Sequence, residues 1–175
     1  MTTRAPDHFA LFGLEPRFAL DAEALERAYR RVQERVHPDR FAAGSAAERR
    51  VAMQWATRAN EAFQTLRSPL KRAAYLCERH GAPIAAESNT AMPAEFLVRQ
   101  LELREALDEA RSDRDPASLV RLRDEVRRLR EETLAALADA LDGVQDYPRA
   151  AGLVRQLMFI EKFGDEVAAA EVEAA

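Results

Sequence analysis

The sequence predicts an all-α protein with a small N-terminal helical domain and a C-terminal three-helix bundle. Apolar residues recur with the period of a helix, and no stretch alternates between apolar and polar residues as a strand would. The 175 residues are 47% hydrophobic, which is enough for one or two domains with real cores.

Charge also divides the chain near residue 80. Residues 1–80 carry 14 Lys and Arg against 10 Asp and Glu (net +4), and residues 81–175 carry 12 against 20 (net −8). We therefore expect two units with different partners, residues 1–81 and 92–175. Residues 82–91 have no periodicity and are the expected linker.

The N-terminal domain is expected to begin with a short helix that leads into a helical hairpin. Asp7 can cap the short helix, and Gly13 ends it. Asp21 caps the next helix, which Pro38 stops. The residue before a proline avoids the α region, so we expect His37 to be extended. The apolar face of this helix consists of Leu25, Ala28, Tyr29, Val32 and Val36.

A long second helix completes the hairpin. Ser45 and Glu48 form a capping box at its start. Two long helices joined by a short connection pack as an antiparallel pair, so residues 37–44 should lie at the exposed tip. We expect Trp55 to be a core residue, because it shares helical spacing with the other apolar residues. That face consists of Ala52, Trp55, Ala59, Ala62, Phe63 and Leu66.

Four more helices are expected after the hairpin. One begins at Ser68-Pro69 and ends at His80-Gly81. The bundle helices begin after Pro93, at Asp115-Pro116 and at Asp146. Their expected core positions are Phe96, Leu103, Leu107 and Ala110, then Leu119, Leu122, Val126, Leu129, Leu137 and Leu141, then Leu153, Leu157, Ile160, Gly164 and Val167. The apolar residues Leu97, Val98, Leu101, Phe159 and Phe163 lie off these stripes.

The His37-Pro38-Asp39 turn is the first candidate site. An acid–base pair needs a pocket and an orienting partner, which a turn tip does not offer, so we predict no catalytic residue. His8 and His80 have no ligand spacing to His37, and we predict no metal site and no cofactor. A turn stiffened by proline loses little entropy on docking, which favours recognition of a partner with an acidic groove.

Two surfaces and one thiol complete the candidates. Arg27, Arg30, Arg31 and Arg35 fall opposite the apolar face of their helix, as a solvated face or as a partner-binding one. Leu97, Val98, Leu101 and Phe159 either pack against the linker or the other domain, or form a partner site rimmed by Glu102, Arg104 and Glu105. Cys77, the only cysteine, is expected to be a buried structural thiol.

Residues 7–76 resemble a J-domain, with a short first helix, a basic second helix, His37-Pro38-Asp39 and a long third helix. Four stretches resemble the HscB family of iron–sulfur cluster co-chaperones. They are Phe9-Ala10-Leu11-Phe12-Gly13-Leu14, His37-Pro38-Asp39-Arg40-Phe41, Asn60-Glu61-Ala62-Phe63-Gln64-Thr65-Leu66-Arg67 and Leu101-Glu102-Leu103-Arg104-Glu105. The last stretch is not a general J-protein feature.

The resemblance implies two partners. Such proteins stimulate the ATPase of an HscA/DnaK-type chaperone through the J-domain and deliver to it an IscU-type iron–sulfur scaffold bound by the C-terminal bundle. Carried over by position, His37, Pro38 and Asp39 would bind the chaperone, with Arg27, Arg30, Arg31 and Arg35 as the electrostatic face. Leu97, Val98, Leu101, Glu102, Glu105 and Phe159 match the scaffold-binding patch. Relatives more usually carry methionine at position 98, and the shorter valine should weaken that contact modestly.

Composition excludes several other classes. The basic residues are interspersed with acids, which argues against nucleic-acid binding. The sequence holds neither a long apolar run nor a leader at its start, so we expect no membrane span and no secretion, and a single cysteine fits a reducing cytoplasm. Eukaryotic members of the family it resembles often add an N-terminal Cys-rich extension, which this sequence does not show, so the resemblance implies a bacterial cytoplasmic protein. It has no Gly-rich phosphate loop, so we do not expect it to hydrolyse ATP. The alternatives are a general J-domain co-chaperone for unfolded clients, an all-α enzyme using His37 and Asp39, and an iron–sulfur carrier through Cys77.

Overall fold

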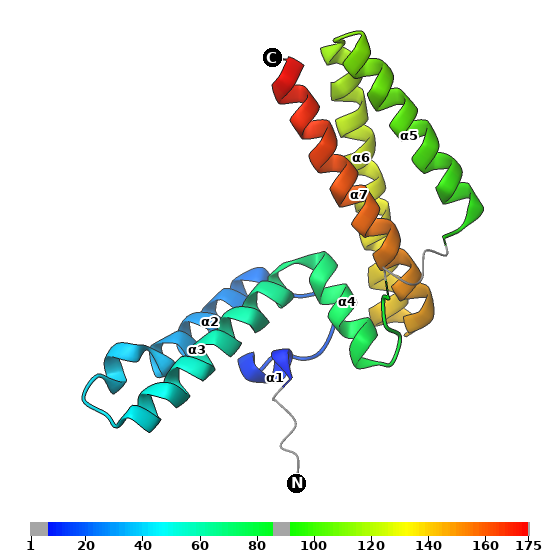
Figure 1. The fold of residues 1–175 in the computed structure, drawn as a ribbon. Coiled ribbons are helices and arrows are strands. Elements are labelled where there is room, and N and C mark those ends of the chain that lie inside the picture. Colours follow the sequence, from blue (N-terminus) through cyan, green and yellow to red (C-terminus); the bar gives the residue numbers. More distant parts are fainter. Residues whose placement is uncertain (1–6, 86–91, 175) are drawn as a thin grey trace. The chain divides into compact units, whose positions relative to one another are not determined.

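The computed structural model describes residues 7–85 and 92–174, and within these ranges it is helical without strands (Figure 1). The chain divides into two compact units, residues 1–76 and 77–175. The division falls within α4 (Pro69–Arg79), whose residues from Cys77 on belong to the second unit. The predicted helical composition is therefore confirmed, and the predicted domain limits at residues 81 and 92 remain a prediction.

The first unit begins with α1 (His8–Phe12) and α2 (Ala22–Val36), and both are capped as predicted. The Asp7 carboxylate accepts a hydrogen bond from the Phe9 N–H, and Gly13 ends α1 with φ +65°. The Asp21 carboxylate accepts from the N–H groups of Glu23 and Ala24. These aspartates satisfy amide donors that a helix start leaves unpaired.

The helix α3 (Ala46–Arg67) packs beside α2 and completes the hairpin (Figure 1). Tyr29 of α2 stacks on Phe63 of α3, with ring centroids 4.1 Å apart. Apolar side chains from α1, α2, α3 and α4 close the core beneath this pair. They are Phe9, Phe12, Leu25, Ala28, Ala59, Ala62, Phe63, Leu66, Ala73 and Leu76.

The expectation that Trp55 is a core residue is wrong, because 36% of its surface is exposed. Trp55 lies on the same side of α3 as the buried Ala62, two helical turns nearer the hairpin tip. The short helix α1 packs against α2 and α3 on the half of the hairpin away from the tip (Figure 1). Helical periodicity identified the side of α3 correctly, but within residues 7–85 no element covers that side at the level of Trp55.

The second unit is a three-helix bundle of α5 (Ala94–Ser112), α6 (Pro116–Ala138) and α7 (Tyr147–Ala174). The predicted core stripes meet there, since Leu103 and Leu107, Leu119 and Leu122, and Ile160 and Val167 are all buried in one cluster. Phe163 was expected off the seam, and this is wrong, because it is 1% exposed. The helix α7 packs against both α5 and α6, so its buried face is wider than one seam.

A π-helical turn, η2 (Asp139–Gly143), ends the α6 segment at the predicted glycine. The start of α7 follows Asp146, whose carboxylate accepts from the Arg149 N–H at 3.0 Å. Residues 82–85 of the expected linker are not helical, yet Ile84 is buried and its carbonyl accepts from the Arg155 guanidinium at 3.1 Å. Residues 86–91 lie outside the described residues.

Cys77 is buried in the second unit, as expected for a structural thiol. Burial raises the pKa of this thiol to about 11. In the described part of the chain, no helix is long and apolar enough to span a membrane, and no group of His, Cys, Asp or Glu has the arrangement of a metal site.

Candidate functional site

The His37-Pro38-Asp39 turn lies at the tip of the α2–α3 hairpin and is fixed at both ends. His37 is extended, with φ −59° and ψ 128°, as the following proline requires. Residues 38–41 form a 3₁₀ turn, η1 (Pro38–Phe41), where only an irregular loop was expected. The Arg40 guanidinium donates to the carbonyl of Glu34 at 3.0 Å, which satisfies an acceptor that the end of α2 leaves unpaired.

The far end of the turn is fixed by the predicted capping box. The Ser45 hydroxyl accepts from the Glu48 N–H at 3.2 Å, and the Glu48 carboxylate accepts from the Ser45 N–H at 2.7 Å. Hydrogen bonds from the backbone and the side chain of Ser45 lower the pKa of Glu48. A Cβ at Gly44 would lie 2.9 Å from the Glu48 carboxylate, so a side chain there would disturb the box. The Arg40 hydrogen bond at one end and the capping box at the other therefore hold the turn in one geometry, although the turn is exposed.

His37 contacts Asp39 in two ways within this turn, through the backbone amide and through the carboxylate. The Nδ1 atom of His37 lies 3.3 Å from the Asp39 N–H and 3.5 Å from the Asp39 carboxylate. One nitrogen cannot accept from the amide and donate to the carboxylate at once, so only one of the two contacts is a hydrogen bond in any one tautomer. When the Asp39 N–H donates to Nδ1, the ring proton is on Nε2. Both side chains are exposed, which suits recognition of a partner rather than acid–base chemistry.

The predicted basic face of α2 is exposed, but its four arginines differ in their surroundings. Arg27 pairs with Glu23 at 3.3 Å, and Arg30 pairs with Glu26 at 3.4 Å, each one turn away. Arg31 and Arg35 have no ion-pair partner among the residues that the structure describes. Unpaired charge is therefore concentrated in the half of α2 nearest His37.

The second candidate surface lies on α5, where Leu97, Val98 and Leu101 are 45%, 55% and 63% exposed. Their exposure agrees with the prediction that they lie off the core stripe. Glu102 and Glu105 are also exposed, and Glu102 pairs with Arg99 at 2.8 Å. An open groove of about 720 Å³ between α5 and α6 begins at Arg99 and Glu102 and continues to Glu109 and Asp113.

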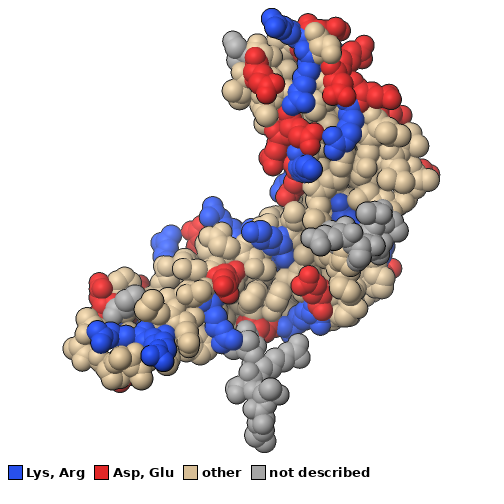
Figure 2. Space-filling view, viewed as in Figure 1, with Lys and Arg blue, Asp and Glu red and all other residues tan. Residues whose placement is uncertain are grey.

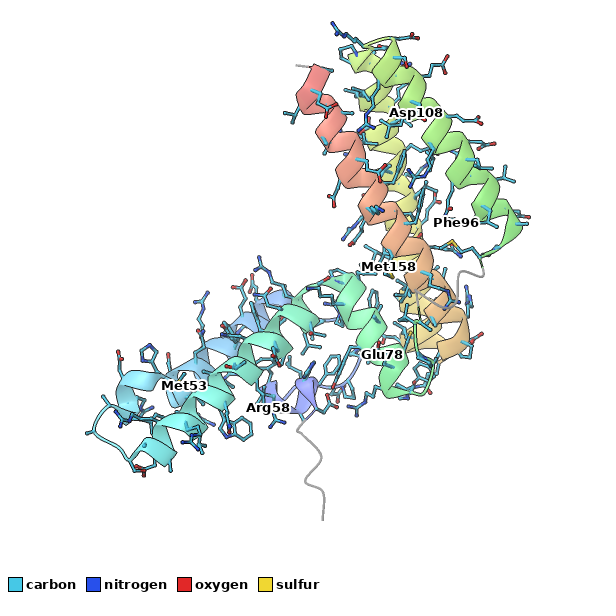
Figure 3. The ribbon with its side chains drawn as sticks, in the orientation of Figure 1. Met53, Arg58, Glu78, Phe96, Asp108 and Met158 are labelled. Carbon is cyan, nitrogen blue, oxygen red and sulfur yellow. The ribbon has the colours of Figure 1, made fainter. Side chains whose placement is uncertain are left out.

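Phe159 of α7 is half-buried and reaches the α5 surface through two neighbours. Phe96 meets its ring edge-to-face at a centroid distance of 5.9 Å. The Arg104 guanidinium lies 5.5 Å above the same ring and also pairs with Glu166 of α7 at 3.3 Å. Figure 3 labels Phe96 near the start of α5 and Met158, the neighbour of Phe159, on α7.

Arg104 is the residue whose role the sequence analysis understated, since it appeared there only as a rim residue. It lies seven residues after Leu97 and three after Leu101, so all three share one face of α5. Its guanidinium then connects that face to Phe159 on a different helix. The spacing along α5 was a visible signal, whereas the contact with Phe159 depends on how α5 and α7 pack. We call Leu97, Val98, Leu101, Glu102, Arg104, Glu105 and Phe159 the α5 patch.

Comparison with known proteins places the whole chain in one family. Residues 92–168 match the model of the HSCB C-terminal oligomerisation domain. The Co-chaperone protein HscB homolog of Bordetella pertussis is 54% identical over 167 residues, which cover 95% of this chain and 97% of that protein.

Two solved structures show the same fold. The chaperone HscB from Vibrio cholerae superimposes with a TM-score of 0.84 at 36% identity, covering 97% of this chain and 100% of that chain. The human co-chaperone protein HscB gives 0.88 at 26% identity, covering 99% and 85%. The two units are thus the predicted J-domain and C-terminal helical bundle, and the chain belongs to the HscB family of co-chaperones.

Proposed function

We propose that this protein is a cytoplasmic co-chaperone with two partners and no catalytic centre of its own. It stimulates the ATPase of an HscA/DnaK-type chaperone through the His37-Pro38-Asp39 turn. It delivers an IscU-type scaffold, bound at the α5 patch, to that chaperone for the maturation of iron–sulfur proteins. The observation that carries the proposal is the capped hairpin that presents an exposed His-Pro-Asp turn beside unpaired arginines.

The α5 patch supports the second half of the proposal. Surface leucines scattered singly are ordinary, but Leu97, Val98 and Leu101 are contiguous and adjoin Phe159 through Arg104. The core of the bundle does not need these three apolar side chains, because Leu103 and Leu107 are the α5 leucines that are buried in it. A folded partner with an apolar surface of its own fits this patch better than a small molecule does.

The test is the steady-state ATPase rate of the HscA-type chaperone of the same cell. The protein and the IscU-type scaffold are added separately and then together. We expect strong stimulation only when both are present. Equal stimulation by any unfolded protein in place of the scaffold would favour a general J-domain co-chaperone, and no stimulation at all would reject the proposal.

A single substitution separates the two sites. His37→Gln should abolish the stimulation and leave scaffold binding unchanged, because the α5 patch lies in the other unit. The binding of the scaffold to the variant is measured by calorimetry beside the ATPase assay. Loss of both activities in a folded variant would contradict the division of labour.

A further inference from the structure

The first half of α3 exposes apolar surface that the proposed contacts do not use. Val51 is 50% exposed and Trp55 is 36% exposed, although both lie on the side of the hairpin where α1 packs. Trp55 precedes the buried Ala62 by seven residues, and Val51 precedes Trp55 by four, so the three share one side of the helix. Among the described residues, no element covers this side between α1 and the His-Pro-Asp turn.

Arginines without acidic partners flank this apolar surface. The Arg58 guanidinium lies 5.8 Å above the Trp55 ring. On α2, Arg31 and Arg35 are exposed one turn apart, in the half of the helix nearest the His-Pro-Asp turn. None of the three arginines is in an ion pair with another residue of the described chain.

The second unit shows that this lack of pairing is not a general property of the chain. There, arginines pair across helices, as Arg123 does with Glu171 at 3.0 Å and Arg130 with Glu161 at 3.3 Å. Figure 2 shows basic and acidic side chains interspersed on that unit. The hairpin tip instead leaves guanidinium groups exposed around a tryptophan, and Trp and Arg are the residue types that dominate binding energy at protein interfaces.

We infer that Val51, Trp55 and Arg58 of α3, with Arg31 and Arg35 of α2, form a second contact surface for the chaperone that the His-Pro-Asp turn engages. We call it the Trp55 surface. The inference rests on the proposed function and extends it. The occupant is an apolar depression on the chaperone, rimmed by carboxylates that pair with the three arginines. Arg35 is two residues from His37, so one partner can cover the turn and the Trp55 surface together.

A protein partner fits this surface better than an anionic lipid bilayer does. Glu34, Asp39 and Glu48 are exposed near the same tip, and they would be repelled by a uniformly negative plane. A protein surface can place carboxylates opposite the arginines and leave the positions opposite those acids neutral.

Trp55 is the only tryptophan in the chain, so its environment can be followed directly. The full-length protein is labelled with 5-fluorotryptophan, and its single ¹⁹F resonance is recorded with and without the ATP-bound chaperone. We expect the resonance to shift and to lose its sensitivity to exchange of H₂O for D₂O. Trp55→Ala should raise the protein concentration needed for half-maximal ATPase stimulation about tenfold, the size typical of an interface aromatic.

Gln64 provides a control on the same helix. It is exposed, and at nine residues from Trp55 it lies on the opposite side of α3. Met53 would not serve, because it lines the same open hollow of α3 as Trp55 and Arg58. Gln64→Ala should leave the stimulation unchanged. Equal effects of Gln64→Ala and Trp55→Ala would overturn the inference, and melting temperatures of both variants show whether either has lost its fold.

The outcomes separate this inference from the function on which it rests. Stimulation by the wild-type protein without a change in the ¹⁹F resonance would overturn the Trp55 surface and leave the proposed function standing. Absence of any stimulation by the wild-type protein would reject the proposed function and the inference together. A resonance that responds to vesicles containing phosphatidylglycerol, and not to the chaperone, would assign the surface to a membrane instead.

Discussion

Leu101→Ala and Leu107→Ala compare an exposed and a buried leucine on the same helix. Leu101 is 63% exposed and Leu107 is 2% exposed. Burying a whole leucine side chain stabilises a protein by about 1.5–3 kcal/mol, so the buried third of Leu101 contributes about 0.5–1 kcal/mol, part of which alanine retains. Leu107→Ala removes the same atoms from the core and should cost about 2–5 kcal/mol, because it also leaves a cavity.

Binding to the scaffold should show the opposite order. Leu97→Ala combined with Leu101→Ala should weaken scaffold binding by about 2–4 kcal/mol, the range of buried interface anchors. That corresponds to a rise in Kd of about 30- to 1000-fold. Leu107→Ala should bind the scaffold with little change for as long as the bundle remains folded, because Leu107 points into the core.

Two measurements check the comparison. Urea unfolding followed by circular dichroism at 222 nm gives the free energy of unfolding of each variant. Isothermal titration with the scaffold gives its Kd. If Leu101→Ala destabilised the protein as much as Leu107→Ala, Leu101 would be a core residue. If the double variant bound the scaffold normally, the α5 patch would not be the scaffold site.

Three further predictions concern the arginines, the glycines and the thiol. Arg31→Ala with Arg35→Ala should reduce chaperone affinity more than Arg27→Ala with Arg30→Ala, because Glu23 and Glu26 already neutralise the second pair; equal losses in the ATPase titration would contradict this. Gly152→Ala should stabilise by about 0.5–1 kcal/mol, because glycine is a poor helix residue and a Cβ there meets only the end of Arg155. Gly164→Ala should not stabilise the protein in this way, because the added Cβ would lie 3.2 Å from the Val126 side chain. The melting temperatures of the two variants test this difference. Cys77 should react with a thiol reagent at pH 8 about two orders of magnitude more slowly than a free cysteine, because its raised pKa keeps it protonated. For the same reason, the thiol should contribute to the free energy of unfolding below about pH 9, and this contribution should be lost as the pH rises toward 11. Urea unfolding at pH 7 and pH 10.5 measures the loss, and Cys77→Ala, which has no thiol, is the control.

The limits of most helices could be predicted from the sequence, because they depend on local chemistry. Asp7, Asp21 and Ser45 cap helices through hydrogen bonds within three residues of themselves, so their neighbours in the sequence are enough to identify them. Pro38 acts on the single residue before it. The exposure of Leu97, Val98 and Leu101 followed from the same local argument, since the period of α5 left them off its core stripe.

The predictions for Trp55 and Phe163 are wrong for the same reason, because burial at these positions depends on which other helices pack against α3 and α7. The period of α3 identified the side of Trp55 but not the distance that α1 extends along it. On α7, the period identified one seam, whereas Phe163 is buried because α5 and α6 cover a wider face. The role of Arg104 at Phe159 depends on the same information, because it connects two helices that are far apart in the sequence. Contacts between helices decide these cases, and the sequence pattern does not contain them.

The distribution of ion pairs implies that binding of the two proposed partners responds differently to salt. At the hairpin tip, Arg31, Arg35 and Arg58 are exposed without acidic partners in the described chain, so their attraction to carboxylates on a partner is screened at high ionic strength. On the α5 patch, the contact that we propose is made by exposed leucines, and Arg104 is already paired with Glu166. Apolar burial is not weakened by salt. Raising NaCl from 50 mM to 500 mM should therefore increase the concentration of protein needed for half-maximal ATPase stimulation and leave the Kd for the scaffold nearly constant. Scaffold binding that weakened with salt as steeply as the stimulation would show that Glu102 and Glu105, rather than the leucines, dominate the α5 patch.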